Sequence, residues 1–417
     1  MPFSKLGLAP VFLVALQRTG LTDPTPIQTA AIPIVLSGTD VVAKAQTGSG
    51  KTLAYGLALL QNLTAGPANS NRDPRALVLV PTRELAIQVS ESLRRITSQL
   101  PQALKVSVIF GGVSINPQMM AMRGGTDVLI ATPGRLLDLM SRNALTLSNV
   151  NMLVLDEADR LLDMGFNEEL HSLRALLPAT RQSLFFSATF PTSVTALTQT
   201  WSVNPTFIEI DDATHERPDI AQRAIGVDTG RRTQLLRHLI QEHRWKRTLV
   251  FVATKHAAEI VADKLRKARI YAEPFHGELS QGKRNQVLSD FKASRLKVVV
   301  ATDMASRGLD IAELPVVVNF DLPRSSDDYT HRIGRTGRAG EAGLAVSFVT
   351  AATQAHFHLI EKRNGIHLNL ETVVGFEPTE VAPAPNSGGI KGTRPNKKDK
   401  LRAQAAAQAL PADTPLQ

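Results

Sequence analysis

The sequence contains no cysteine in its 417 residues. Disulfides and zinc sites built from thiolates are therefore excluded, and the composition suits a reducing compartment such as the cytoplasm. No apolar run approaches the roughly 20 residues that a membrane-spanning helix needs. The apolar segment 6–16 follows a single cation and has no obvious small-residue cleavage site. With Pro10 near its start, it favours a surface helix over a secretory signal.

Length and charge set further bounds. A chain of 417 residues exceeds the usual size of one core, so two domains are expected. The formal charge of +9 and the pI near 9.8 favour a polyanion as partner, although a basic surface can also serve solubility alone. From residue 377 the chain is rich in Pro, Ala, Gly and Gln, and residues 386–417 hold six Lys/Arg against two Asp. We expect a disordered basic tail over 377–417.

Short apolar runs alternate with helical patterns along most of the chain. Their continuous hydrophobicity indicates strands buried on both faces, and hence an α/β fold with mainly parallel sheets covered by helices. The polar segment 211–219 predicts a linker between a first domain, 1–210, and a second, 220–376. The expected strands are 41–43, 76–80, 106–110, 128–131, 152–155, 183–186 and 207–210, then 248–252, 298–301, 316–320 and 345–349.

A glycine-rich segment, Ala45–Thr52, lies between an expected strand and an expected helix. Gly48 and Gly50 allow backbone N–H groups to converge on a phosphate, and the helix N-terminus adds partial positive charge. Lys51 can reach the terminal phosphates and Thr52 can bind Mg²⁺. The strict phosphate-loop pattern begins with Gly, however, where this chain has Ala45. A glycine-rich turn without a ligand is the alternative. The second domain has no such loop.

The strand at 152–155 ends in a group of carboxylates, Asp156, Glu157 and Asp159. Ligands of a parallel sheet sit beyond the carboxyl ends of its strands, so these acids can face the phosphate loop. Asp156 would hold Mg²⁺ through water, and Glu157 would orient and deprotonate the attacking water. A solvated acidic helix start is the simpler interpretation of the acids alone. Together with the Lys51 loop, they favour a nucleotide site.

The tetrad Asp-Glu-Ala-Asp at 156–159 is the signature of the DEAD-box RNA helicases, which this chain resembles over residues 3–375. That family also carries Ala where Ala45 stands. The resemblance implies two tandem RecA-like domains, ATP and Mg²⁺ as cofactors, and RNA as partner. Further matching motifs follow in the family's order, namely Pro81–Ala86, Gly111–Gly112, Thr132–Arg135, Ser187–Thr189, Gln281–Arg284, Ala301–Asp303, Arg307–Asp310 and His331–Arg338.

The resemblance also assigns the nucleotide-binding residues. Gln28 matches the glutamine that reads the adenine edge with its amide, and Phe3 matches an upstream aromatic residue that stacks on the base. Leu21 departs from the aromatic usually found there, and a loop-and-helix cap without a ligand is the alternative for this region. Asp310 would bind the ribose hydroxyl. The phosphate-loop residues implied to bind ATP are Thr47, Gly48, Ser49, Gly50, Lys51 and Thr52.

The basic motif His331–Arg338 would complete the ATP site from the second domain. The resemblance assigns Arg335 and Arg338 to the γ-phosphate across the cleft, where a guanidinium can grip phosphate oxygens in a bidentate manner. His331 would bridge motifs at the closed interface rather than act as a base. A solvated basic turn is the alternative for these residues in isolation. Catalysis is therefore expected to require closure of the two domains.

RNA contacts are implied in both domains, by positions that hold the sugar-phosphate backbone of one strand. Such contacts carry no sequence information, so binding is expected to be sequence-independent and salt-sensitive. Three further residues, Asp159, Ser187 and Thr189, would couple hydrolysis to strand separation, although buried strand-end hydroxyls are as simple an interpretation. The implied RNA-binding residues are Arg83, Gly112, Thr132, Arg135, Gln281, Arg284, Thr302 and Gly308.

These expectations describe an ATP-dependent RNA helicase that unwinds short duplexes or remodels RNA–protein complexes through RNA-stimulated ATP hydrolysis. An ATP-gated RNA clamp with little unwinding needs the same closed state and stays open as an alternative. A DNA helicase is a third, less favoured by the motifs. The compact core, short N-terminus and short basic tail resemble bacterial family members that act in ribosome assembly and mRNA turnover. We expect a cytoplasmic monomer.

Overall fold

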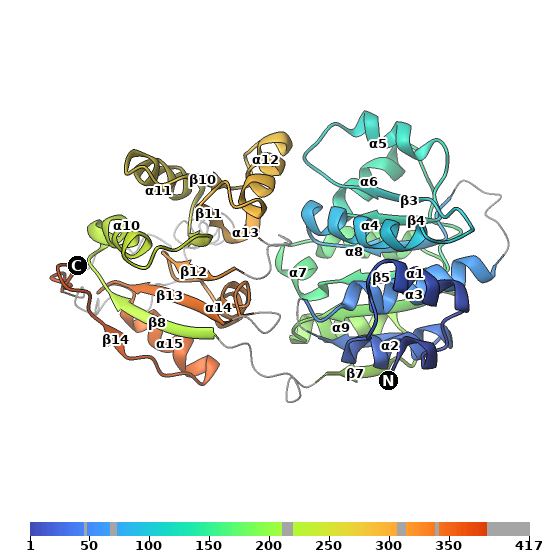
Figure 1. Ribbon diagram of the computed structural model, residues 1–417. Helices are drawn as coiled ribbons and strands as arrows, with labels where there is room; N and C mark the ends of the chain where they lie inside the picture. The colour runs from blue at the N-terminus through green and yellow to red at the C-terminus, as the bar shows by residue number, and fades with distance from the viewer. Residues whose placement is uncertain (46–47, 67–72, 211–219, 307–313, 338–341, 382–417) are drawn as a thin grey trace, which may run out of the picture.

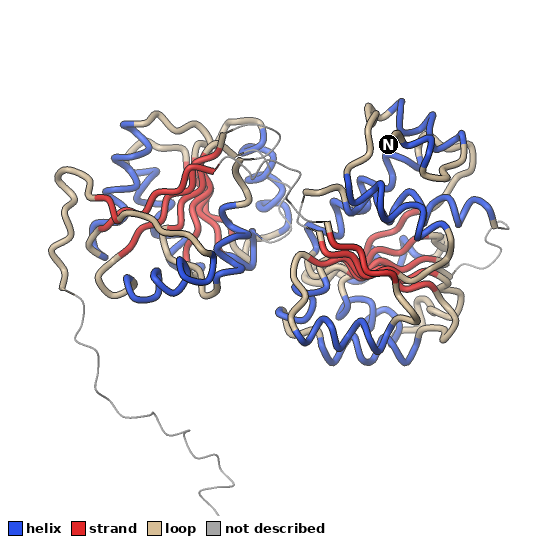
Figure 2. Tube along the Cα trace, turned by 90° about the horizontal axis from the view of Figure 1, so that it is seen from below, coloured by secondary structure: helices blue, strands red, loops and turns tan. Residues whose placement is uncertain are grey.

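The computed structural model describes residues 1–45, 48–66, 73–210, 220–306, 314–337 and 342–381. Within them the chain forms two α/β domains, each with a sheet of seven parallel strands (Figure 1). Seen from below, each sheet is a layer between helices (Figure 2). The expected α/β architecture with parallel sheets is confirmed. The predicted linker 211–219 and the tail beyond residue 381 lie outside the described residues.

Domain 1 has the strand order β3-β4-β2-β5-β6-β1-β7. A short 3-10 turn at Phe3–Lys5 precedes its first helix. The strands are β1 Val41–Lys44, β2 Ala76–Leu79, β3 Val106–Ile109, β4 Val128–Ala131, β5 Met152–Asp156, β6 Gln182–Ser187 and β7 Thr206–Glu209. The helices are α1 Pro10–Arg18, α2 Pro26–Leu36, α3 Lys51–Ala65, α4 Arg83–Thr97, α5 Ile115–Met122, α6 Pro133–Ser141, α7 Ala158–Asp163, α8 Asn167–Leu176 and α9 Thr192–Trp201.

Domain 2 has the strand order β10-β11-β9-β12-β13-β8-β14, with a 3-10 turn at Thr229–Arg231. The strands are β8 Ile220–Gly226, β9 Thr248–Val252, β10 Ala272–Phe275, β11 Val298–Thr302, β12 Val316–Asn319, β13 Gly343–Val349 and β14 Leu370–Glu371. The helices are α10 Arg232–Glu242, α11 Lys255–Lys267, α12 Gln281–Lys292, α13 Asp303–Ser306, α14 Ser326–Ile333 and α15 Gln354–Asn364.

Continuous apolar strands are buried on both faces, as predicted. In β2, Val78 packs into one core cluster while Leu77 and Leu79 pack into the cluster on the opposite face. The strands β8, β10 and β14 were not predicted from the sequence. β10 carries Glu273 and Pro274 and lies at the edge of its sheet, where a missing backbone donor is tolerated. The composition of β10 therefore did not predict a strand, although its place at the sheet edge allows one.

The last described residues pack onto domain 2. Thr379 N donates to Asp228 Oδ1 over 2.7 Å, and Glu380 N donates to the same oxygen over 2.9 Å. The guanidinium of Arg231 lies 5.0 Å from the centre of the Phe376 ring. Hydrogen bonds to domain 2 thus continue beyond residue 376, where the sequence placed the end of the domain. Among the described residues, none of the helices combines the length and apolar character needed to cross a membrane.

Candidate functional site

The phosphate loop joins β1 to α3, which begins at Lys51. Gly48 and Gly50 have φ values of 89° and 91°, a region that favours glycine. A Cβ at Gly50 would lie 2.5 Å from Gln28 Nε2, so glycine is also required by the close approach of this side chain. Ser49 lies in the loop and Thr52 lies in the first turn of α3. Thr47 lies outside the described residues.

Gln28 fastens α2 to the phosphate loop. Its Nε2 donates to Gly50 O over 3.1 Å, and its Oε1 accepts from Thr25 N over 3.0 Å as part of a capping box. Each of these atoms makes one of these bonds, so the second amide N–H and the second lone pair of Oε1 are left for an adenine edge. Phe3 is only 5% exposed and belongs to the domain core. The ring therefore packs against the core of domain 1 and exposes only a small part of its surface.

Asp156 lies at the carboxyl end of β5, opposite the start of α3. Its Oδ2 accepts a hydrogen bond of 2.9 Å from Tyr55 Oη, and both side chains are buried. Burial raises the pKa of Tyr55 well above its usual value, so the hydroxyl stays protonated and donates. Tyr55 was missed from the sequence. Its spacing of four residues from Lys51 places both on one face of α3, and this spacing is the signal that could have revealed it.

Two buried polar atoms at this point have no hydrogen-bond partner within the described part of the chain, Lys51 Nζ and Asp156 Oδ1. Burial raises the pKa of Asp156, while the positive charge of Lys51 opposes that rise. An ammonium and a carboxylate oxygen left without partners suit a phosphate and a divalent cation, because each would satisfy one of them. The Thr52 hydroxyl hydrogen-bonds to Tyr55, next to Asp156. The residues present therefore fit ATP with Mg²⁺.

Glu157 occupies a left-handed backbone position with φ 53°, just before α7. This conformation is costly for a side chain larger than glycine and is typical of functional turns. Its Oε2 forms a 2.9 Å ion pair with Arg160, and both side chains are 5% exposed. The carboxylate is thus held at the sheet edge next to Asp156.

Asp159 links β6 to α7. Its Oδ2 accepts from both the backbone N and the hydroxyl of Thr189, over 2.9 and 2.8 Å. Ser187 Oγ accepts from Asp159 N over 3.2 Å and donates to Thr189 O over 2.8 Å. Burial acts to raise the pKa of Asp159, but the hydrogen bonds from Thr189 and Ser187 outweigh it, so this pKa lies below its usual range. The structure therefore brings all three expected coupling residues together.

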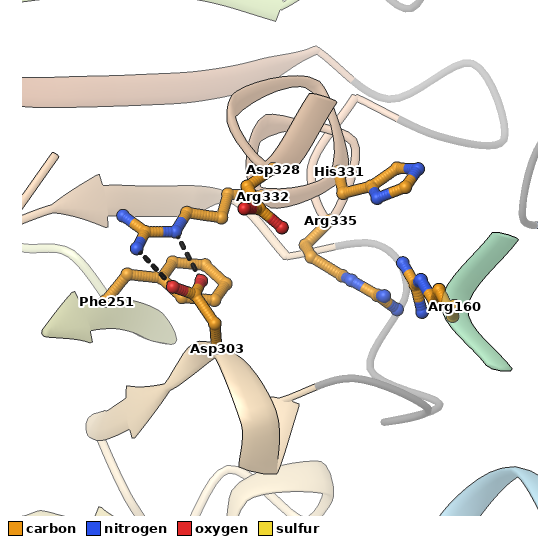
Figure 3. A pocket seen from close by; sticks show the side chains of 7 residues that line it. All are labelled: Arg160, Phe251, Asp303, Asp328, His331, Arg332 and Arg335. Carbon is orange, nitrogen blue, oxygen red and sulfur yellow. Dashed lines mark hydrogen bonds and ion pairs between the residues drawn. The ribbon is translucent and has the colours of Figure 1, made fainter. Parts of the chain in front are cut away.

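The motif that begins at His331 faces domain 1 across a small pocket (Figure 3). Arg335 points from domain 2 toward Arg160 of domain 1, so two guanidinium groups approach the same space. Burial lowers the pKa of His331 to about 4, with a further contribution from the charge of Arg160. His331 is thus neutral at pH 7, which suits a bridging role. Arg338 and Asp310 lie outside the described residues.

Arg332 has a structural role that the sequence did not reveal. Its Nε and Nη2 bind Asp303 Oδ1 and Oδ2 over 2.6 and 2.7 Å, as Figure 3 shows. Nη1 donates to Asn319 Oδ1 over 3.1 Å, and the guanidinium lies 4.8 Å from the Phe251 ring centre. Arg332 therefore ties α14 to the carboxyl ends of β9, β11 and β12, which positions its neighbours His331 and Arg335.

The expected RNA residues meet across the domain boundary. Arg83 of domain 1 donates to Gln281 Oε1 of domain 2 over 2.8 Å. Arg284, 3% exposed, forms a 2.6 Å ion pair with Glu84, whose side chain is 10% exposed. RNA would have to displace these partners to reach the guanidinium of Arg284.

The remaining positions divide between the two domains. A Cβ at Gly112 would lie 2.8 Å from Arg83 Nη2, so these two are adjacent. Thr132 Oγ1 accepts from Gly111 N over 3.3 Å, and Arg135 donates to Val113 O over 2.8 Å. These four expected residues of domain 1 thus gather around one loop, at 111–113. Thr302 ends β11, and Gly308 lies outside the described residues.

Comparison with known proteins identifies this arrangement. Residues 25–197 match the DEAD/DEAH box helicase family model, and residues 231–340 match the model of the helicase conserved C-terminal domain. The DEAD-box ATP-dependent RNA helicase CshA of Geobacillus kaustophilus is 39% identical over 86% of this chain and 76% of its own length. The chain belongs to the DEAD-box helicase family. The resemblance inferred from the motifs is confirmed.

Other DEAD-box proteins are longer than this chain. The ATP-dependent RNA helicase DeaD of Escherichia coli K12 is 41% identical over 83% of this chain but only 54% of its own length. The DeaD of Buchnera aphidicola subsp. Baizongia pistaciae is 38% identical over 88% of this chain and 60% of its own length. The chain thus spans little more than half of these relatives.

Solved structures share the two-domain fold. Yeast Dbp5 bound to RNA and ADP BeF3 is 30% identical with a TM-score of 0.78, covering 89% of this chain and 95% of Dbp5. Mss116p bound to ssRNA and AMP-PNP is 26% identical with a TM-score of 0.79, covering 89% and 78%. The tandem RecA-like architecture predicted for this DEAD-box chain is therefore confirmed.

Proposed function

We propose that the chain is an ATP-dependent RNA helicase that couples RNA-stimulated ATP hydrolysis to local unwinding of short duplexes. The observation that carries the proposal is a pocket in which Arg335 of domain 2 meets Arg160 of domain 1, the ion-pair partner of Glu157 at the acidic strand end. Neither domain alone contains both sets of groups. Turnover would therefore depend on closure of domains that we place at 1–210 and 220–376, joined by the linker 211–219.

Each ATP-site residue has a proposed task. Lys51 and the loop amides hold the phosphates, Thr52 and Asp156 hold Mg²⁺, and Glu157 orients and deprotonates the water. When bound, the cation would neutralise charge on the β- and γ-phosphates. Gln28 reads adenine with the amide N–H and the Oε1 lone pair that its bonds to Gly50 and Thr25 leave available. The proposed nucleotide site also includes Phe3, Thr47, Gly48, Ser49, Gly50 and Asp310.

Domain 2 supplies positive charge to the transition state. We assign this role to Arg335 and Arg338, because an arginine finger accelerates phosphoryl transfer by roughly 10³ to 10⁵. That range corresponds to about 4 to 7 kcal/mol of barrier. His331 is neutral and lies near Arg160. It can therefore bridge the two domains without repelling the arginines. The network of Asp159, Ser187 and Thr189 couples ATP hydrolysis to separation of the RNA strands.

RNA is the proposed polyanionic partner, bound through its backbone without sequence preference. The pairs Arg83–Gln281 and Glu84–Arg284 support this, because they bring the expected RNA residues of the two domains together. Closure around one strand would bend it and break pairs of a short duplex. Proteins of ribosome assembly or RNA decay are proposed as further partners of a cytoplasmic monomer.

Replacing Glu157 by Gln tests the proposal. Glu157→Gln should abolish ATP turnover while ATP and RNA still bind, because Gln keeps the size of the side chain and an acceptor oxygen for Arg160 but cannot act as a base. Glu168→Gln, a matched change on the exposed start of α8, should leave turnover unchanged. Full ATPase activity in Glu157→Gln would remove this residue from its proposed role. A strand-displacement assay on a short RNA duplex separates the helicase from an ATP-gated clamp, which would bind the duplex without displacing a strand.

A further inference from the structure

Domain 2 carries a concentration of positive charge at the amino ends of three adjacent strands. The sheet order β10-β11-β9 places the loops before these strands side by side, and Figure 1 shows β10 and β11 as neighbours. These loops and the helix ends that lead into them are residues 264–271, 292–297 and 243–247. They contain four, three and three Lys/Arg respectively and no Asp or Glu. We call them together the basic edge.

Backbone hydrogen bonds fix the alignment of these loops. Lys297 N donates to Tyr271 O over 2.9 Å, and Thr248 N donates to Lys297 O over 2.9 Å. The strand register pairs Ala272 with Val298, and Val298 with Thr248. The residues just before these positions therefore stand in one row across the sheet. The charges of the three loops lie on one surface rather than being scattered around the domain.

The basic edge is separate from the site described above. Phe251 and Asp303 of the pocket lie at or beyond the carboxyl ends of β9 and β11, whereas the basic edge precedes their amino ends. A strand of five residues spans about 17 Å. A molecule bound at the basic edge therefore occupies another face of domain 2 and does not compete with the cleft.

Helix dipoles account for only part of this charge. The helices α10, α11 and α12 end at the basic edge, and cations in a last turn stabilise a helix C-terminus. That effect fades beyond the last turn. Arg244, Lys246 and Arg269 lie two to four residues after their helices end, and all are exposed. Stabilisation of the helix ends therefore does not explain why these three cations are present.

Local carboxylates neutralise part of the charge. Asp263 lies 2.7 Å from Lys267 Nζ, and Asp290 lies 2.7 Å from Arg295 Nε. Glu273 lies 3.8 Å from Arg266 Nη1. These carboxylates lie outside the three loops and are fewer than the ten cations that the loops contain. The basic edge therefore keeps a positive excess.

An exposed aromatic ring lies among these cations. Tyr271 is 75% exposed, although tyrosine usually buries most of its ring. It immediately precedes the edge strand β10, and its carbonyl accepts a hydrogen bond from Lys297 N. Proteins that bind single-stranded nucleic acid without sequence preference combine two features: cations that contact the phosphate backbone and aromatic rings on which bases stack. The basic edge has both. An acidic protein segment would use the cations but not the face of the ring.

We propose that the basic edge is a second binding surface for single-stranded RNA, which holds a flanking segment of the same RNA that the cleft engages. This inference rests on the proposed function, because it is the helicase cleft that brings RNA to the domain. The surface keeps a long RNA attached while the cleft is open between turnovers. Its contribution is independent of nucleotide, in contrast to binding in the closed cleft.

A triple variant of the full-length chain tests the basic edge. Arg244→Asn, Lys246→Gln and Arg269→Asn are combined, with Asn at the two positions whose φ is 51° and 60° because it tolerates this conformation. The matched control combines Arg18→Gln, Lys362→Gln and Arg363→Gln, which removes the same charge from exposed helix positions elsewhere. A third variant, Tyr271→Ser, removes only the ring.

Fluorescence anisotropy with labelled single-stranded RNA of about 30 and about 10 nucleotides gives the readout, the shorter being within the range of a single groove. Without nucleotide, the triple variant should bind the longer RNA about 10- to 100-fold more weakly at low salt, and the slope of log K against log salt should fall by about 2. Tyr271→Ser should weaken it by about 5- to 100-fold without changing that slope, as loss of one stacked base predicts. The control and the short RNA should show no change.

Four outcomes would overturn the inference. They are wild-type affinity of the triple variant for the longer RNA, an equal loss in the control, an equal loss with the short RNA, and an unchanged affinity in Tyr271→Ser. ATPase stimulation by the short RNA, which should be unchanged in every variant, verifies folding. It also separates the two proposals. If the short RNA stimulates wild-type ATPase while the basic edge proves irrelevant, only this inference fails. If RNA neither binds nor stimulates the wild type, both fail.

Discussion

The Tyr55 hydroxyl donates a 2.9 Å hydrogen bond to Asp156 Oδ2 inside the core of domain 1. Tyr55→Phe should keep the packing of the ring, whose centre lies 5.2 Å from that of Phe186, and remove only the donor. Leaving the buried carboxylate without this bond should lower the free energy of unfolding by about 1–3 kcal/mol. Because Asp156 is the proposed Mg²⁺ residue, the concentration of Mg²⁺ for half-maximal nucleotide binding should rise, as a fluorescent nucleotide titration would measure. Tyr271→Phe, an exposed hydroxyl, is the control. An unchanged Mg²⁺ requirement would show that Tyr55 does not position Asp156.

Arg335 should act on the rate and not on nucleotide affinity. Arg335→Lys keeps a charge but loses the planar fork that grips phosphate oxygens. Single-turnover ATP hydrolysis should slow by roughly 10³ or more, while the Kd for ATP changes little. Arg363→Lys on the exposed side of α15 should behave as wild type. A loss of affinity with an unchanged rate would place Arg335 in ground-state binding instead.

The buried pair Glu84–Arg284 should stabilise contact between the domains. Glu84→Gln leaves the guanidinium without its carboxylate, and breaking a buried pair costs about 3–5 kcal/mol. The closed population, measured by energy transfer between dyes on the two domains, should fall in Glu84→Gln and in Arg284→Gln. The double variant should lose less than the sum of the two. Additive losses would mean that the residues do not interact in solution.

His331 should make domain contact sensitive to acid. Its pKa is lowered to about 4 by burial and by Arg160, against an ordinary value of 6.5. Above pH 6.5 the imidazole is neutral in open and closed forms, so the contact is fully stable. As the pH falls from 6.5 toward 4, the open form binds a proton that the closed form excludes, and closure should weaken. Energy transfer measured across this range should show the effect.

His331→Gln should remove most of this pH dependence, while the exposed His171→Gln should retain it. Asp159 titrates in a different window. Its pKa is lowered below 3.8 in the folded protein, so its contribution is present above that value and is lost only as the pH falls further. A slope between pH 6.5 and 4 that survives in His331→Gln would assign the effect to another group.

The sequence predicted much of the fold because its strands are short, apolar and buried on both faces. Val316–Asn319 and Val298–Thr302 show this most clearly, since their valines leave little choice of structure. β8 and β10 escaped because Arg223 and Pro274 contradict a central strand, and only pairing with neighbours reveals them. β10 lies at the sheet edge and β8 lies between β13 and β14, and in both cases pairing in the sheet outweighs local composition.

The candidate site was predictable where a motif fixes chemistry and not where tertiary contact does. The carboxylates at 156–159 could be expected to face the phosphate loop, because both segments follow the carboxyl ends of parallel strands. The bonds of Tyr55 to Asp156 and of Arg332 to Asp303 join segments about 100 and 29 residues apart. No local pattern announces these partners. Gln28 and Phe3 show the reverse case, since the motif named them but not their present bonds or burial.

The docking of Thr379 and Glu380 on Asp228 has a practical consequence. These anchors hold the chain on domain 2 as far as Glu380, so a group attached at Val381 lies one residue from the last of these hydrogen bonds. A fluorescent label or affinity tag at Val381 would move together with domain 2. Such a label would report the position of that domain whenever the protein opens or closes.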